Sequence, residues 1–193
     1  MPRIDTLILY SNAIKKHGVT PEGVCWHNEA SQRIRFEIIL SLLPKSLKDA
    51  TLYDAGCGFG DFYHYLKEKN QLPKAYTGID IHPQMCAIAK EKSLQNVIQA
   101  DIIYDELPVC DYYIASGSLN LLTTFEAVLC IQNLYKSSKK GLIFNVLCSK
   151  SSSQTYNYMA KEQLQTIAKE LHVTKYRFKE GYLADDISVA FYR

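Results

Sequence analysis

The chain has 193 residues, of which 47% are hydrophobic and 22% charged, and a formal net charge of +2. This length suits one folding unit, and the composition excludes a disordered or fibrous protein. Because attraction to a phosphate backbone or an anionic membrane needs clustered Lys and Arg, nucleic acid is not expected as the main partner. The start shows no signal-peptide pattern and no apolar run approaches the ~20 residues that span a bilayer, which predicts a cytoplasmic protein without a membrane span.

The cysteines are far apart and favour no metal site. There are six of them, and none forms a CxxC pair or has a histidine at zinc-finger spacing. Most lie in apolar runs, as buried free thiols do. We therefore expect no bound metal, while the oligomeric state stays open.

An N-terminal helical cap is predicted over residues 1–46, ahead of a core over residues 47–193. Apolar residues recur at helical spacing over residues 4–17, and Gly18 suits the end of that helix. Turn chemistry follows at residues 20–23. A second helix begins near Asn28, a good N-cap, and is stopped by Pro44.

Within the core, strand-like and helix-like patterns alternate. The predicted strands are residues 51–55, 75–79, 96–100, 111–115 and 141–147, and the predicted helices between them are residues 61–69, 83–93 and 123–137. This alternation implies an α/β doubly wound domain, with a mainly parallel sheet and helices on both faces.

The C-terminal part breaks the alternation. A helix over residues 156–171 is followed by strand-like runs 174–179 and 187–192, which complete seven strands as an antiparallel hairpin. The serine-rich residues 149–155 are predicted to form a mobile loop.

A glycine-rich turn follows the first core strand, in Asp54-Ala55-Gly56-Cys57-Gly58-Phe59-Gly60. Alternate glycines permit a tight turn and let a ligand approach the main chain. A dinucleotide fingerprint needs its last glycine one place later, where this chain has Asp61. A carboxylate there would repel pyrophosphate, which disfavours NAD and FAD.

The turn resembles motif I of class I S-adenosylmethionine-dependent methyltransferases, in which D/E-x-G-x-G-x-G follows the first strand. The resemblance extends to small bacterial members of unassigned substrate. It implies S-adenosylmethionine as cofactor, with the loop, including Gly56, Cys57, Gly58 and Gly60, against its methionine portion. The acid of the motif, Asp54, would support that end of the site.

Two further strands end on acids that match this family. Asp80 ends the second strand, about twenty residues beyond the glycine loop, where a carboxylate can accept both ribose hydroxyls. Ile81 would offer an apolar face to adenine. On the third strand, Asp101 and Ile102 resemble the pair that bonds the adenine amino group and a ring nitrogen. Parallel strands would bring these acids to one sheet edge.

The fourth strand and its following loop, residues 110–120, resemble motif IV, which faces the transferring methyl group. Residues 115–118 read Ala-Ser-Gly-Ser instead of N-P-P-[YF], which disfavours adenine or cytosine N-methylation. Ser116, Gly117 and Asn120 are candidates to line the pocket, Ser116 as a cofactor contact. The alternative is a plain strand-to-helix loop.

A segment before the glycine loop resembles a W…S-Q-x-x-R-F pattern in the same bacterial methyltransferases. It runs over residues 26–36 and places Gln32 and Arg33 on a helix expected to fold back over the loop. Arg33 suits bidentate contact with the methionine carboxylate. The alternative is that Arg33 and Arg35 are solvated helix charges.

The resemblance implies methyl transfer to an acceptor that the sequence does not name. A small molecule is favoured, because no RNA-binding module or long insertion accompanies the core. An RNA methyltransferase and a non-catalytic S-adenosylmethionine-binding protein remain alternatives. If a general base is needed, His27, His64, His82 and several tyrosines are candidates, and the sequence does not choose among them.

Overall fold

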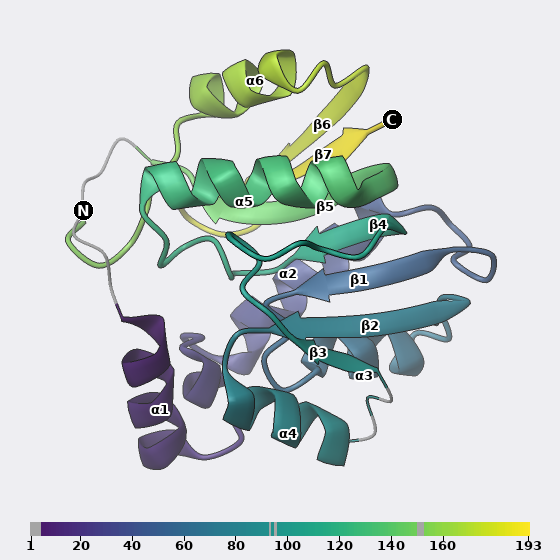
Figure 1. Ribbon diagram of the computed structural model, residues 1–193. Helices are drawn as coiled ribbons and strands as arrows, with labels where there is room; N and C mark the ends of the chain where they lie inside the picture. Colours follow the sequence, from purple (N-terminus) through teal and green to yellow (C-terminus); the bar gives the residue numbers. More distant parts are fainter. Residues whose placement is uncertain (1–4, 93, 95, 150–152) are drawn as a thin grey trace.

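The computed structural model describes residues 5–92, 94, 96–149 and 153–193. Its centre is a seven-stranded sheet with the strand order β3-β2-β1-β4-β5-β7-β6 (Figure 1). The first five strands in this order are parallel, whereas β7 runs antiparallel to both β5 and β6. The strands are β1 (Thr51–Ala55), β2 (Ala75–Asp80), β3 (Val97–Gln99), β4 (Cys110–Ala115), β5 (Ser138–Leu147), β6 (Lys175–Glu180) and β7 (Asp186–Tyr192).

Helices cover both faces of this sheet. They are α1 (Thr6–His17), α2 (Glu29–Leu42), α3 (Asp61–Glu68), α4 (Pro83–Glu91), α5 (Thr124–Ser137) and α6 (Lys161–Glu170), with a 3-10 turn η1 (Pro21–Val24). One apolar core lies under α5 and α6, and a second lies under α2 and α3. The predicted doubly wound fold with a C-terminal antiparallel hairpin is confirmed.

Local signals fix the ends of the helices. The Asn28 side chain accepts a hydrogen bond of 2.8 Å from the Ser31 amide and starts α2. Thr123 and Glu126 form a capping box that starts α5. The first helix, α1, packs through Ile14 on Phe59 and Met85, at the edge where the parallel strands end (Figure 1).

Two predicted starts were wrong by three residues or more, and the other bounds differ by smaller amounts. The helix predicted over residues 156–171 begins at Lys161, because Tyr158 instead forms a parallel bridge with Leu147 and the Asn157 amide bonds the Asn120 carbonyl. Strand β5 begins three residues earlier than predicted, at Ser138. Part of the predicted loop 149–155, and the start of the predicted first helix, lie outside the described residues.

None of the helices in the described part of the chain is long and apolar enough to cross a membrane.

Candidate active site

The glycine loop leaves β1 through three left-handed residues. Gly56, Gly58 and Gly60 have φ angles of 78°, 54° and 79°, which side chains rarely adopt. The amides of Gly56 and Cys57 both donate to the Ile79 carbonyl, at 2.7 and 3.0 Å. The turn is therefore tied to the end of β2.

The loop is also pressed between two other segments. A Cβ on Gly56 would lie 2.4 Å from the Ser118 Cβ, and one on Gly58 would lie 3.2 Å from a methyl group of Val24. Ser118 donates to the Ala55 carbonyl at 2.9 Å, which holds the loop after β4 against β1. Glycine is needed here for space as well as for backbone conformation.

Asp80 ends β2 with its carboxylate almost fully buried. Its two oxygens accept the amides of Gly58 and His82, each at 2.9 Å. Burial raises the pKa of the carboxyl, and these two N–H groups oppose the rise. The carboxylate thus links the glycine loop to the start of α4, and each oxygen keeps a lone pair for a ligand.

Asp54 lies deeper, below the glycine loop. It is 2% exposed, and its Oδ2 accepts a hydrogen bond of 2.6 Å from the Tyr76 hydroxyl. Burial raises its pKa to about 7, the Tyr76 bond opposes the rise, and the charges of Asp80 and Asp61 add to it. A nearby cation would therefore lower the pKa of Asp54 and favour its ionised form.

The third acid, Asp101, follows β3. Its Oδ1 accepts the Ile103 amide at 2.8 Å, and its own amide donates to Asp105 at 2.8 Å. These bonds shape a tight turn that carries Ile102 beside it. The predicted pair lies at the same sheet edge as the other two acids.

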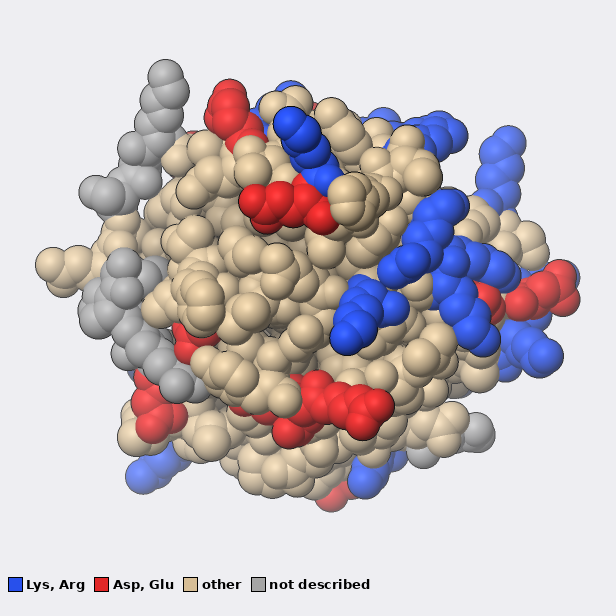
Figure 2. Space-filling model, turned by 45° about the horizontal axis from the view of Figure 1, so that its top comes forward, with Lys and Arg blue, Asp and Glu red and all other residues tan. Residues whose placement is uncertain are grey.

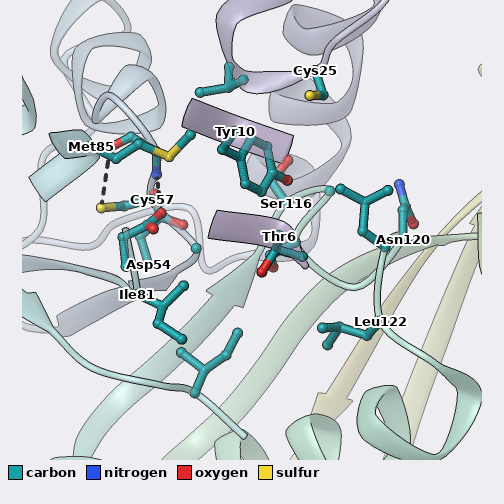
Figure 3. Close-up of a pocket in the computed structure, with 18 of the residues that line it drawn as sticks. Thr6, Tyr10, Cys25, Asp54, Cys57, Ile81, Met85, Ser116, Asn120 and Leu122 are labelled. Carbon is teal, nitrogen blue, oxygen red and sulfur yellow. Dashed lines mark hydrogen bonds between the residues drawn. The ribbon is translucent and has the colours of Figure 1, made fainter. Parts of the chain in front are cut away.

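One cavity connects these residues at the carboxyl ends of the parallel strands, and we call it the edge cavity (Figure 3). The predicted residues that line it are Asp54, Gly56, Cys57, Gly58, Asp80, Ile81, Asp101, Ile102, Ser116, Gly117 and Asn120. Gly60 is not among its lining residues: it is the N-cap of α3, and a Cβ there would meet Leu94 at 3.4 Å. The structure brings the acids and the glycine loop together around this one cavity.

Arg33 is placed outside the edge cavity. Its guanidinium donates to Glu68 at 2.8 Å and lies 5.4 Å from the centre of the Tyr65 ring. Gln32 lines the edge cavity instead and donates to Asp61 at 3.1 Å. Adjacent residues on a helix differ by about 100° in direction, so only one of the two can face the glycine loop. The alternative of a solvated helix charge fits Arg33 as the structure places it.

Comparison with known proteins gives a family for this arrangement. Residues 52–141 match the family model described as a methyltransferase domain, which spans the strands and loops that carry the three acids. The match covers just under half of the chain, and together with the fold it supports a class I S-adenosylmethionine-dependent methyltransferase. No curated protein sequence matches it.

Solved structures share the methyltransferase fold at low identity. Magnesium protoporphyrin IX methyltransferase from Synechocystis PCC 6803, with bound S-adenosylhomocysteine, is 16% identical with a TM-score of 0.68, over 84% of this chain and 83% of that one. A possible histamine N-methyltransferase from Thermotoga maritima is 14% identical with a TM-score of 0.66, over 84% and 88%. The small RNA methyltransferase HEN1 is 17% identical with a TM-score of 0.61, over 85% of this chain and 25% of that one. Such likeness shows the fold, which serves acceptors of different kinds.

The methyl donor of this family, S-adenosylmethionine, is a cation, and the edge cavity fits it in chemistry. The carboxylates of Asp54, Asp80 and Asp101 line it, and the glycine loop presents main chain without side chains. The Ser116 hydroxyl is buried there without a hydrogen-bond partner in the described residues. A buried hydroxyl of this kind awaits a ligand or water.

Sequence reasoning predicted an N-terminal cap but did not identify the residues of this segment that line the edge cavity of the methyltransferase. Thr6 and Tyr10 from α1, and Cys25 after η1, line it opposite the strand ends (Figure 3), and Trp26 lines it as well. The burial of Tyr10 raises the pKa of its hydroxyl. Tyr156, after the serine-rich loop, lines it as well. The only signal for these residues was the resemblance around Trp26, since the packing of α1 on the strand edge is a tertiary effect.

None of the three histidines considered as a base is among the described residues that line the edge cavity. The ring of His27 is exposed and bonds the side chain of Asn28 at 2.9 Å. His64 lies on α3. His82 is buried with its Nε2 3.0 Å from the Ser11 hydroxyl, which joins α4 to α1.

The burial of Asp54 predicts a pH-dependent stability. In the unfolded chain an Asp has a pKa of about 3.9, so between about pH 4 and about pH 7 the folded state holds this proton more tightly. Its contribution to stability is therefore fully present below pH 4 and is lost as the pH rises through 7, by on the order of a few kcal/mol. Urea unfolding of the parent and of Asp54→Asn across this range should show the variant gaining relative stability as the pH rises. Parallel pH profiles would contradict the prediction.

Proposed function

We propose that this methyltransferase transfers a methyl group from S-adenosylmethionine to a small-molecule acceptor inside the edge cavity. The observation that carries the proposal is that one cavity joins the ends of the acid-bearing strands to the N-terminal helical segment. In this proposal residues 1–46 act as a cap and residues 47–193 as the core. A cytoplasmic location is included, because all six cysteines are free thiols.

The proposed cofactor contacts follow from position. Asp80 binds the ribose hydroxyls with its two remaining lone pairs, and Asp101 and Ile102 bind the edge of adenine, with Ile81 against its face. Gly56, Cys57 and Gly58 lie along the methionine portion, whose positive charge Asp54 stabilises from below. Gly60 shapes the turn. Ser116 lies at the end of β4, between cofactor and acceptor.

Methyl transfer does not require a covalent bond between the protein and either reactant. The bound cofactor supplies an electrophilic methyl group, and the transfer is an in-line displacement. The chain contributes by holding two reactants in one orientation and by excluding water from between them. Helix α1 supports both tasks, because it closes the edge cavity with Thr6 and Tyr10.

A small acceptor is favoured over RNA by where one cluster of basic residues lies. Lys139 and Lys140 are at the start of β5 and Lys175 is at the start of β6. These residues lie at the amino ends of the strands, whereas the edge cavity lies at the carboxyl ends. In the view of Figure 2, Lys and Arg side chains are most densely gathered on the right-hand side. A polynucleotide held by those residues would lie far from the carboxyl ends of the strands.

A binding experiment tests the proposed cofactor site. Ligand-free protein should be stabilised by S-adenosylhomocysteine by about 2.7 kcal/mol at a hundredfold excess over Kd, because the ligand binds only the folded state. NAD at the same concentration should leave the melting temperature unchanged. The reverse preference, or no stabilisation, would overturn the proposed site.

Transfer of label tests the acceptor. Labelled S-adenosylmethionine incubated with cell extract should transfer its methyl group to the small-molecule fraction. Label in the RNA fraction would favour the RNA alternative, and binding without any transfer would favour the non-catalytic one.

A further inference from the structure

The single tryptophan of the chain, Trp26, forms a wall of the edge cavity. Its ring lies against the main chain just after β4: a Cβ on Gly117 would be 2.7 and 2.9 Å from two ring carbons. The Gly117 amide is fixed in turn by Asn145, whose Oδ1 accepts it at 2.7 Å. Trp26 therefore contacts the part of the sheet that the proposed function assigns to methyl transfer.

The positively charged side chain of Arg35 packs against this ring. The Arg35 guanidinium lies 4.7 Å from the centre of the Trp26 ring, and Arg35 is not among the residues that line the edge cavity. It forms an ion pair with Asp186 of β7, in which Nε donates to Oδ2 at 2.6 Å. The two side chains are only 11% and 1% exposed. The Tyr182 hydroxyl donates to the other oxygen of Asp186 at 2.6 Å.

This arrangement fixes the plane of the indole. The Arg35 guanidinium has little conformational freedom, because it packs on an aromatic face and is bonded to a buried carboxylate. The Trp26 indole is held between this guanidinium and the main chain at Gly117, so its orientation is restricted as well. Arg33, two residues earlier on the same helix, has a side chain that is 44% exposed and faces Glu68. The difference between the two arginines shows that the Arg35 contact is specific to one face of α2.

The edge cavity that Trp26 lines also has other aromatic and polar lining residues. Tyr10 and Tyr156 line the edge cavity from α1 and from the segment before α6. Beside Gly117, the buried Ser116 hydroxyl has no partner in the described part of the chain. An aromatic wall next to an unused hydroxyl fits a flat ring that carries one hydrogen-bonding group.

We propose that Trp26 is the stacking wall of an acceptor subsite, that Arg35 is the positioning residue which fixes its ring, and that the subsite takes a flat aromatic molecule with an N–H or O–H group. This inference rests on the proposed methyl transfer, because it places the acceptor beside the end of β4. It adds a substrate class that the family does not specify.

The substrate class is tested with two amines of equal charge and similar size. Benzylamine is flat and aromatic, whereas cyclohexylmethylamine is saturated, and each is titrated into protein saturated with S-adenosylhomocysteine while Trp26 fluorescence is followed. We expect benzylamine to change the emission and to bind about three- to tenfold more tightly, the usual gain from aromatic pairing. Equal affinities, or no response of Trp26 to either amine, would overturn the inference. Cofactor binding is confirmed first by calorimetry, so its failure is distinguishable from failure of the subsite.

The positioning role is tested with Arg35→Met and the matched control Arg33→Met. We expect Arg35→Met to make Trp26 emission more accessible to acrylamide and to lower the benzylamine preference towards one, while Arg33→Met changes neither. Because Arg35→Met leaves a buried carboxylate unpaired, Arg35→Met/Asp186→Asn is measured as well, and Arg35→Lys should restore the preference in part. A folded double variant with parental quenching and preference would refute the positioning role.

Discussion

An Asp80→Ala variant is expected to bind S-adenosylhomocysteine at least about a hundredfold more weakly than the parent, as measured by calorimetry. In the proposed complex both carboxylate oxygens accept ribose hydroxyls, and each hydrogen bond to a charged group contributes about 1.5–3 kcal/mol. Two such bonds are lost together. The amides of Gly58 and His82 also lose their acceptor, which loosens the glycine loop itself.

The matched control for this variant is Asp111→Ala. Asp111 also belongs to a strand of the parallel sheet, but near the amino end of β4, where it accepts the Thr51 amide at 2.9 Å and pairs with Lys140. Its loss should lower stability without changing cofactor affinity. Urea unfolding of both variants separates the two effects. Parental affinity in folded Asp80→Ala would remove ribose binding from the role of this residue.

Much of the fold followed from local sequence patterns. The apolar runs and their bounding residues predicted β1 and its bounds, and the acids at three strand ends were expected at one sheet edge, where the structure places them. The start of α6 could not be predicted in this way. Residues 156–160 have a helix-compatible pattern, but the Asn157 amide bonds the carbonyl of Asn120, which lies in a distant part of the chain, and Tyr158 bridges to Leu147.

In the candidate site, too, some residues could be predicted from local sequence patterns and others depend on tertiary packing. Asp54, Asp80 and Asp101 each lie at or just beyond the end of a strand, so their place at the edge depends only on the strands being parallel. Which side of α2 faces the glycine loop depends on how that helix docks, and the sequence alone could not separate Gln32 from Arg33. The wall formed by Tyr10 and Trp26 depends on the docking of α1 and η1, which no local pattern specifies.

Gly56→Ala is expected to lower the free energy of unfolding by about 2–5 kcal/mol, measured in urea. A left-handed backbone costs an alanine about 1–2 kcal/mol, and forcing a methyl group into an occupied space costs about 1–3 kcal/mol more. The space is occupied by the Ser118 Cβ, which lies 2.4 Å from where a methyl group on Gly56 would be. Gly181→Ala is the matched control, since Gly181 has a φ of 81° and nothing within 4 Å of its Cβ position. Gly181→Ala should lose only the stability that corresponds to the left-handed backbone, about 1–2 kcal/mol.

The double variant Gly56→Ala/Ser118→Gly isolates the packing part of this loss. Removing the Ser118 Cβ makes room for the methyl group, but it also removes the hydroxyl that donates to Ala55. Recovery should therefore be partial, with the conformational cost at Gly56 remaining. The Gly56 amide bonds the Ile79 carbonyl at 2.7 Å, so relief of the clash should also restore the tie between the glycine loop and β2, and with it affinity for S-adenosylhomocysteine. Equal losses of unfolding free energy in Gly56→Ala and Gly181→Ala would mean that the glycine loop moves away from Ser118 at no cost. The close approach of Gly56 to Ser118 would then not contribute to the stability of the loop.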